Sequence, residues 1–228
     1  MLSAVLLDVD GTLIDSNEAH ARAWADILRE RGWPDVTWQE ILPLIGMGGD
    51  KLLPKVTGIA IDSKQGKALA EERTEHFLTA YAPTIRAWPG TRELLEAIRD
   101  RGLKRVIATS AKDDELEILL DHAGVADLIT RETTSDDAKG KSKPDPNIIV
   151  AALGKAHAAA GEAIMIGDTP YDVEAAGRAG VRTIAFRCGG WGDEPLAGAV
   201  AIYAGPAELA ARFDESPLGG KAGVSDKL

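Results

Sequence analysis

Short aliphatic runs alternate with amphipathic segments along most of the chain. The runs that predict β-strands are residues 4–9, 104–108, 126–130, 163–166 and 182–186. Between these runs, apolar residues at helical spacing predict helices over residues 91–102, 113–122, 145–155 and 170–179. Strands and helices that alternate in this way are typical of a parallel sheet covered on both faces. The expected fold class is therefore α/β, with a Rossmann-like parallel-sheet core.

The alternation is interrupted after the first strand. Residues 16–87 hold no convincing strand pattern. Helices are predicted over residues 16–31 and 63–81, and the capping-box spacing of Thr37 and Glu40 predicts that a further helix begins there. We therefore expect an all-helical cap subdomain, residues 16–87, inserted in an α/β core of residues 1–15 and 88–228. The tail after residue 214 is rich in Gly, Ser and Lys and is expected to fray.

The composition narrows the choice of partners and compartment. The 228 residues, 45% of them hydrophobic and 27% charged, fit one globular core with an insertion. A net charge of −10 repels phosphate backbones and anionic lipids, so we expect neither nucleic acid nor a membrane as a partner. The single cysteine, Cys188, excludes an intrachain disulfide, and no apolar run approaches the roughly 18 residues of a membrane helix. We expect a cytoplasmic monomer or homodimer.

Polar residues gather where predicted strands end, which is where parallel sheets bind ligands. The groups are Asp8 and Asp10 in Asp-Val-Asp-Gly-Thr-Leu, Thr109 with Ser110, Lys143 in Lys-Pro, and Asp168 with Asp172 in Gly-Asp-Thr-Pro-Tyr-Asp. Each group alone also fits an ordinary role, such as a turn, a helix cap or a solvated charge. Their joint occurrence at successive strand exits favours a site.

These motifs, in this order, resemble those of the haloacid dehalogenase-like hydrolase superfamily over residues 4–187. The long helical insertion resembles the cap of the subgroup that contains phosphoglycolate phosphatases and beta-phosphoglucomutases. The resemblance implies a Mg²⁺-dependent phosphatase. Such an enzyme would hydrolyse a small phosphorylated metabolite through an aspartyl-phosphate intermediate, and the resemblance implies an enzyme like the phosphoglycolate phosphatases, with a substrate of the phosphoglycolate type.

The resemblance also implies catalytic roles. Asp8 is the expected nucleophile, and Asp10 is the expected acid for the leaving oxygen and base for the attacking water. Because a halide leaves without a proton, the dehalogenase branch lacks the second carboxylate, so Asp10 favours phosphoryl chemistry. Thr109 is expected to donate to a phosphate oxygen, with Lys143 neutralising charge.

The phosphate and the metal are expected to share this edge of the sheet. Ser110 and the backbone N–H groups of Val9 to Gly11 are the expected further phosphate ligands. The resemblance assigns Mg²⁺ to Asp8, Asp168 and the backbone carbonyl of Asp10, because hard cations prefer oxygen ligands. Asp172 is expected to orient Lys143 or a metal-bound water.

Two features of the insertion are candidates for reading the substrate. The turn over residues 46–51 offers glycines for a closing lid, with Gly49 and the Lys51 ammonium as candidate substrate contacts, although an ordinary helix-helix turn fits it equally. His20 lies in a stretch that resembles beta-phosphoglucomutases, where a cap histidine approaches the acid-base aspartate.

Two alternative functions remain open. A beta-phosphoglucomutase-like hexose phosphomutase is one, but mutases usually carry an arginine at the position of Gly49, and this departure weakens the resemblance. A phospho-receiver or metal-binding regulatory domain is the other, since it also places acids and a lysine at strand ends. The Asp-x-Asp pair and the long cap argue against it.

Overall fold

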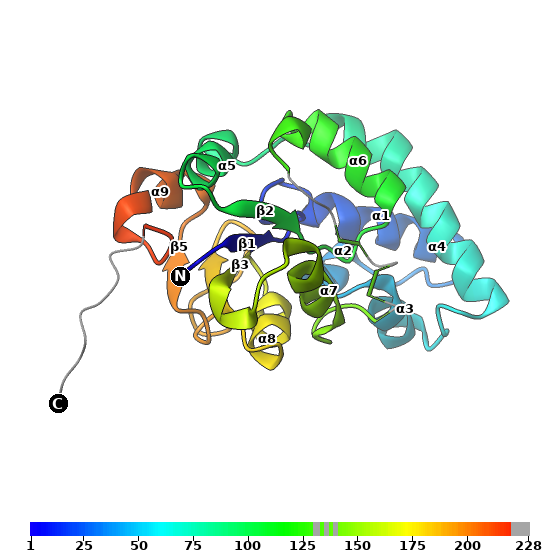
Figure 1. Cartoon of the computed structure of the whole chain (residues 1–228). Helices are drawn as coiled ribbons and strands as arrows, with labels where there is room; N and C mark the ends of the chain where they lie inside the picture. Colours follow the sequence, from blue (N-terminus) through cyan, green and yellow to red (C-terminus); the bar gives the residue numbers. More distant parts are fainter. Residues whose placement is uncertain (130–132, 135–136, 139–140, 220–228) are drawn as a thin grey trace.

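The computed structural model describes residues 1–129, 133–134, 137–138 and 141–219. Its centre is a five-stranded sheet in the order β2-β1-β3-β4-β5, and every neighbouring pair is parallel. The strands are β1 (Ala4–Leu7), β2 (Lys104–Ile107), β3 (Ala163–Gly167), β4 (Arg182–Phe186) and β5 (Ala201–Tyr203). The expected α/β class with a parallel sheet is confirmed (Figure 1).

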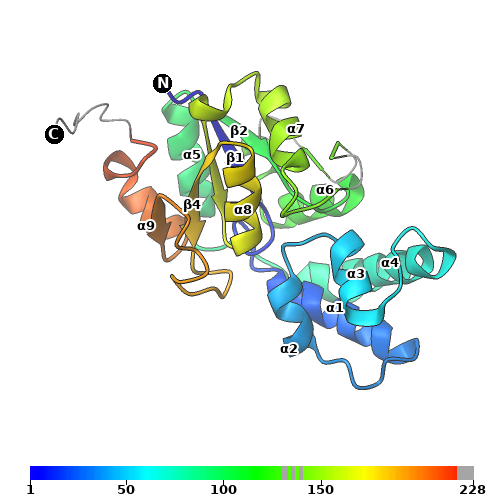
Figure 2. The same cartoon turned by 90° about the horizontal axis from the view of Figure 1, so that it is seen from below.

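Helices cover both faces of this sheet, as Figure 2 shows. Side chains alternate along β1: Val5 and Leu7 join the core with α5 (Thr91–Asp100), α6 (Asp113–His122) and α9 (Pro206–Ala211). Ala4 and Leu6 join a second core with α7 (Asn147–Ala156) and α8 (Pro170–Arg178). Because both faces are buried, the strands are continuous aliphatic runs.

The prediction of a strand over residues 126–130 is wrong. Ala126–Leu128 is a short 3-10 helix, whose Leu128 side chain is buried in the core, and residue 130 lies outside the described residues. The fifth strand is instead β5, which the pattern did not predict because three residues at a sheet edge carry too little periodicity.

Residues just beyond position 214 pack against the core. Phe213–Glu215 forms a 3-10 helix, and both Phe213 and Leu218 are buried in the core. The expected fraying from residue 214 is therefore wrong as far as residue 219. Residues 220–228 lie outside the described part of the chain.

Residues between β1 and α5 form a helical layer with its own apolar core. Its helices are α1 (Asn17–Glu30), α2 (Trp38–Ile41), α3 (Gly49–Thr57) and α4 (Lys64–His76), followed by a π-helical turn, Phe77–Tyr81. The predicted capping box of Thr37 and Glu40 is present at α2. The helix α3 was not predicted. It begins at Gly49, inside the turn expected over residues 46–51, so Lys51 belongs to the first turn of this helix.

The helical layer stands beyond the carboxyl ends of the strands (Figure 2). The two chain segments that lead into and out of it run side by side, since the Asp15 N–H donates to the Arg86 carbonyl and the Trp88 N–H to the Leu13 carbonyl. Further short helices are Leu42–Leu44, Ala82–Thr84 and Ala160–Glu162. The division at residues 15 and 88 stays a prediction.

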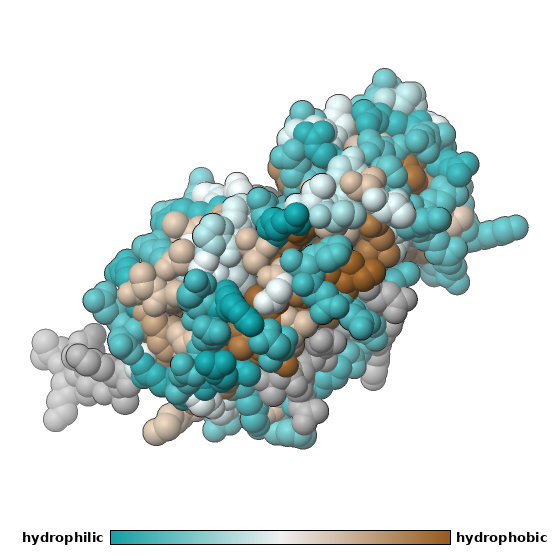
Figure 3. All heavy atoms as spheres, turned by 90° about the horizontal axis from the view of Figure 1, so that it is seen from above, coloured by the Kyte–Doolittle hydropathy of each residue, from teal (hydrophilic) through white to brown (hydrophobic). Residues whose placement is uncertain are grey.

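The surface of the protein is mainly polar on the face drawn in Figure 3, with hydrophobic atoms gathered toward the middle of the molecule. Within the described ranges, no helix combines the length and apolar character that a membrane crossing requires. The oligomeric state and the compartment stay predictions.

Candidate active site

Three carboxylates meet where β1 and β3 end. These strands pair in parallel with Leu7 beside Ile166, so Asp8 leaves β1 next to the residues that lead from β3 into α8. The side chains of Asp8, Asp168 and Asp172 are all buried, and one oxygen of each lies within 4.8 Å of the others. The parallel register therefore brings Asp8 to two acids that follow it by 160 and 164 positions in the chain.

One lysine ties this group together. The Lys143 Nζ lies 2.5 Å from Asp8 Oδ1 and 2.7 Å from Asp172 Oδ1, and its side chain is only 1% exposed. Asp172 is held in turn by a capping box, in which its Oδ2 accepts from the Thr169 N–H at 3.0 Å and from Thr169 Oγ1 at 2.7 Å. Asp172 thus positions the ammonium beside Asp8.

The site is electrostatically unbalanced by itself. Burial raises the pKa of Asp8 well above its ordinary value, the charge of Asp172 adds to this, and Lys143 offsets it only in part. Burial and Asp172 also raise the pKa of Asp168 to about 7. Burial lowers the pKa of Lys143, but Asp172 and Asp8 outweigh burial and raise it above its ordinary value. Three carboxylates facing one ammonium leave an excess of negative charge.

A divalent cation such as Mg²⁺ fits this excess. Hard cations bind oxygen ligands, and the donors here are carboxylates. Asp8 and Asp168 are the residues that would hold it, together with the Asp10 carbonyl, which accepts no backbone hydrogen bond from the described residues. Asp172 belongs to the same cluster, but Lys143 and Thr169 already engage its two oxygens.

Two partners of Asp168 were missed in the sequence. Thr12 Oγ1 donates to Asp168 Oδ1 at 2.7 Å, and Asn17 Nδ2 donates to Asp168 Oδ2 at 3.0 Å and to the Gly189 carbonyl at 3.2 Å. A Cβ on Gly189 would lie 1.7 Å from Asp168 Oδ2, so only glycine fits there. Thr12 is part of the first motif and could have been suspected; Asn17 and Gly189 carry no motif signal.

Asp10 faces the helical layer rather than the carboxylate cluster. Its Oδ1 accepts from Ser16 Oγ at 2.6 Å and lies 2.7 Å from His20 Nε2. Burial raises the pKa of Asp10, but His20 and Ser16 outweigh it and lower the pKa to about 2. Asp10 is therefore ionised in this arrangement.

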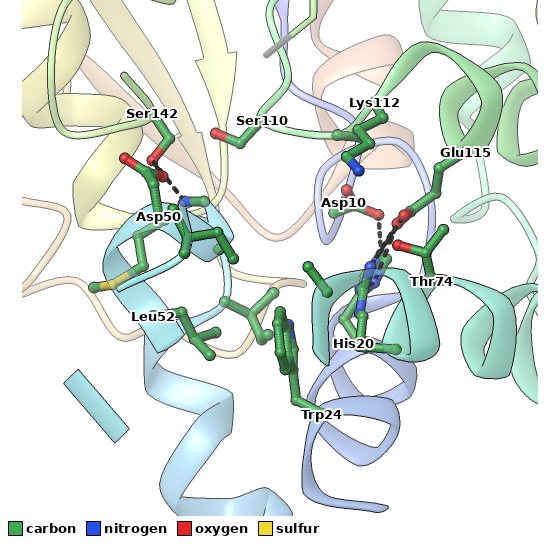
Figure 4. A pocket seen from close by; sticks show the side chains of 18 of the residues that line it. Asp10, His20, Trp24, Asp50, Leu52, Thr74, Ser110, Lys112, Glu115 and Ser142 are labelled. Atoms are coloured by element: carbon green, nitrogen blue, oxygen red, sulfur yellow. Dashed lines mark hydrogen bonds and ion pairs between the residues drawn. The ribbon is translucent and has the colours of Figure 1, made fainter. Parts of the chain in front are cut away.

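His20 belongs to a chain of contacts that continues to Glu115 (Figure 4). Arg73 on α4 donates to His20 Nδ1, and its Nη1 lies 3.0 Å from Glu115 Oε2 on α6. A guanidinium has no acceptor, so Nδ1 of the ring must accept and Nε2 must carry the proton that is donated to Asp10. Arg73 and Glu115, which no motif marked, thus set the tautomer of His20.

The phosphate end of the site offers hydroxyl and backbone donors. Thr109 Oγ1 accepts from the Ala111 N–H at 3.1 Å, which leaves its O–H free to donate. Ser110 Oγ is buried and has no partner among the described residues. The N–H of Gly11 is taken by the Ile14 carbonyl at 2.8 Å, whereas no backbone hydrogen bond of the described chain uses the N–H groups of Val9 and Asp10. The turn therefore presents two donors and not three.

A cavity of about 420 Å³ lies between the sheet edge and the helical layer. Asp8, Asp10, Thr109 and Ser110 line it from the core, and His20 and Gly49 from the cap. The structure thus brings half of the predicted site residues to the lining of one cavity, while Lys143, Asp168 and Asp172 lie behind it around Asp8.

Lys51 is placed elsewhere. It is not among the lining residues, because its ammonium lies 2.7 Å from Asp145 Oδ2 and donates to the Ser142 carbonyl. Ser142 Oγ accepts from the Gly48 N–H at 3.0 Å. Lys51 therefore fastens α3 to the loop that carries Lys143.

Comparison with known proteins agrees with these motifs. The sequence pattern described as haloacid dehalogenase-like hydrolase matches residues 5–186. The chain belongs to this family. A phosphoglycolate phosphatase of Rhodospirillum rubrum is 30% identical to it over 212 residues, which cover 89% of this chain and 87% of that protein.

Solved structures of the family share the fold. A hydrolase from Pseudomonas syringae is 32% identical, with a TM-score of 0.85 over 93% of this chain and 98% of its own. A protein from Bacteroides vulgatus, provisionally called a beta-phosphoglucomutase, is 28% identical, with a TM-score of 0.83 over 93% and 88%. The resemblance to haloacid dehalogenase-like hydrolases is confirmed, and the chain is an enzyme of this family.

The contact between Arg73 and Glu115 is testable with a matched pair. Glu115→Gln leaves the buried guanidinium without its counter-charge, so we expect the free energy of unfolding to fall by about 3 kcal/mol and kcat/KM to fall roughly tenfold. Glu117→Gln, on the exposed side of the same helix, should change neither. Urea denaturation and steady-state kinetics measure both; equal behaviour of the two variants would contradict the role of Glu115.

The carboxylate cluster predicts stabilisation by Mg²⁺. At a concentration 100-fold above its Kd, Mg²⁺ should raise the Tm by about 5 to 10 °C, because only the folded state gathers the ligands. Asp168→Asn should lose most of this shift, since it removes a charged ligand. Differential scanning calorimetry with Mg²⁺ or EDTA measures the effect, and Asp127→Asn, an exposed control, should keep it. An unchanged shift in Asp168→Asn would remove Asp168 from the metal site.

Proposed function

We propose that the chain is a Mg²⁺-dependent phosphatase that hydrolyses a small phosphorylated metabolite through an aspartyl phosphate on Asp8. The observation that carries the proposal is the buried Lys143 ammonium, which touches Asp8 Oδ1 and leaves the second oxygen of that carboxylate unengaged by it. Asp8 and Asp10 both line one cavity. The phosphoglycolate phosphatase of R. rubrum supports a phosphatase over other hydrolases.

The first half-reaction transfers the phosphoryl group to the enzyme. The free oxygen of Asp8 attacks phosphorus while the bond to the leaving oxygen breaks, and Asp10 gives that oxygen a proton. Thr109, Ser110 and the N–H groups of Val9 and Asp10 hold the phosphoryl oxygens. Asp8 and Asp168 are the residues that would hold Mg²⁺, which would supply positive charge next to the phosphoryl oxygens.

The second half-reaction restores the enzyme. Asp10, now a carboxylate, takes a proton from water, whose oxygen attacks phosphorus and displaces Asp8. Inorganic phosphate leaves, and Asp10 releases the proton to the departing phosphate or to solvent, which returns it to the ionised form in which the cycle began. The hydrogen bonds of Asp10 with Ser16 and His20 hold one of its oxygens, so that the other is directed to the reacting atoms.

The low pKa of Asp10 fits this order of events. Asp10 begins ionised, and a phosphomonoester has a second pKa of about 6, so the substrate monoanion can bring the proton that Asp10 later gives to the leaving oxygen. The negative charge of the bound phosphoryl group also raises the pKa of Asp10 and stabilises its protonated form. No further acid is required.

The alternatives have less support. A phosphomutase must bind a second phosphate. Among the described residues that line the cavity, the arginine is Arg73, and it is already paired with Glu115. A phospho-receiver or regulatory domain is disfavoured by membership in a hydrolase family. Free phosphate released from a sugar bisphosphate would distinguish the phosphatase, because a mutase retains the group.

The nucleophile can be tested by one substitution. Asp8→Asn keeps the size of the side chain but removes the attacking charge, so we expect kcat to fall by at least about 10⁴-fold on any phosphomonoester. Asp15→Asn, an exposed control two residues beyond the motif's Leu13, should keep its activity. Colorimetric phosphate release in Mg²⁺ measures both. Steady turnover by Asp8→Asn above that level would overturn the assignment.

The acid role of Asp10 predicts a dependence on the leaving group. Asp10→Asn should lower kcat/KM by about 10² to 10⁴ for an alkyl phosphate, whose oxygen needs a proton as it departs. For p-nitrophenyl phosphate the loss should be much smaller in the first half-reaction, measured as the initial burst of p-nitrophenol. Rapid-mixing absorbance for the aryl ester and phosphate release for the alkyl ester give the two values. Equal losses would contradict protonation by Asp10.

A further inference from the structure

Apolar side chains of the cap form part of the lining of the cavity. Trp24 on α1, Leu52 on α3 and Ala70 on α4 line it from three cap helices, together with Ile45, Met47 and Ile61. Trp24 and Leu52 flank this space in Figure 4. A wall of this kind binds apolar surface, because water that contacts it is displaced on binding.

The charges around this wall are mainly negative. Asp50, Asp62 and Glu71 line the cap side, and Lys67 is the cation that lies among them. Lys112, which immediately follows the Thr109–Ala111 stretch at the end of β2, lines the same cavity from the core. A second anionic group on the substrate would therefore meet repulsion at the cap end.

Lys67 brings one positive charge against the three acids of the cap lining. Two other cationic side chains, Lys51 and Arg73, have other partners. Lys51 is held by Asp145 and the Ser142 carbonyl, and it does not line the cavity. Arg73 lines the cavity, but it is paired with Glu115 and donates to His20. Neither the Lys51 ammonium nor the Arg73 guanidinium is free to neutralise a carboxylate or a second phosphate.

We propose that the substrate is a phosphomonoester whose leaving group has an apolar body and no second anionic group. This inference rests on the proposed phosphatase function and deepens it. The cavity as a whole, including the end beside Asp8 and Asp10, has a volume of about 420 Å³, which lies in the range of roughly 300 to 1,000 Å³ that ligand pockets occupy. The cap thus selects against 2-phosphoglycolate.

Three alkyl phosphates with similar leaving oxygens test separately the preference for an apolar leaving group and the exclusion of a second anionic group. They are ethyl phosphate, 2-phenylethyl phosphate and 2-(4-carboxyphenyl)ethyl phosphate. We expect kcat/KM for the phenylethyl ester to exceed that for ethyl phosphate by about tenfold or more, because a ring becomes buried. The added carboxylate should lower kcat/KM about tenfold, because it enters a negative and apolar space.

Two cap variants test whether the cap residues that line the cavity cause these differences in kcat/KM. Ile61→Asn should reduce the preference for the phenylethyl ester over ethyl phosphate about threefold to tenfold. The double change Asp62→Asn with Glu71→Gln should raise kcat/KM for the carboxylated ester several-fold relative to its uncharged parent. Asp35→Asn, an exposed cap carboxylate outside the cavity, is the control and should leave all three values unchanged.

The outcomes distinguish this inference from the function on which it rests. If ethyl phosphate or the carboxylated ester is the better substrate while all three are hydrolysed, the leaving-group assignment is overturned and the phosphatase stands. Equal values for 2-phosphoglycolate and the phenylethyl ester have the same consequence. If none of these esters, nor p-nitrophenyl phosphate, releases phosphate with Mg²⁺, the proposed function fails and the inference with it.

Discussion

The contact between the Lys143 ammonium and the carboxylates of Asp8 and Asp172 is the interaction on which the site depends. Removing these charges from water costs several kcal/mol for each ion, and their attraction offsets that cost only at short range. The distances of 2.5 and 2.7 Å meet this condition. Because Asp8 follows β1 and Asp172 lies in α8 after β3, the contact exists only in the observed strand register. The pairing of β1 with β3 therefore also positions the charged side chains of the site.

The same contact leaves the site incomplete. The charge of Lys143 balances one of the three buried carboxylates. The raised pKa values of Asp8 and Asp168 reflect their burial and the negative charge that remains unbalanced. A nucleophile has to be ionised, so the positive charge that is missing must come with a cation. In the proposed mechanism, this excess of buried negative charge lowers the stability of the chain alone and favours the binding of a cation.

The cap controls the second aspartate by a different route. Asp10 is joined through His20 and Arg73 to Glu115, which returns the chain of contacts to the core at α6. These contacts can exist together only when the cap lies against the core. The hydrogen bonding of Asp10 is therefore coupled to cap position, and the acid-base group is set only when the cavity is covered.

Sequence patterns were informative where chemistry follows directly on a strand. Asp8 and Asp168 leave aliphatic runs, so their approach at one sheet edge follows from parallel strands. Arg73 and Glu115 are 42 positions apart on unrelated helices, and nothing local marks their contact. The edge strand β5 and the capture of Lys51 by Asp145 are similar cases, because tertiary neighbours decide them and not local periodicity.

The division of labour between core and cap explains why the fold alone does not name a substrate. A hydrolase and a provisionally named phosphoglucomutase match this chain with TM-scores of 0.85 and 0.83, so their backbones scarcely distinguish them. The residues that we propose to hold and cleave the phosphoryl group lie on the core, and their proposed roles do not depend on the leaving group of the monoester. Differences in substrate between such enzymes are therefore expected in the cavity lining that the cap supplies. A single charged side chain there changes whether an anionic group is attracted or repelled. In this chain that lining is Trp24 and Leu52 with Asp62 and Glu71, and it is there that selectivity is decided.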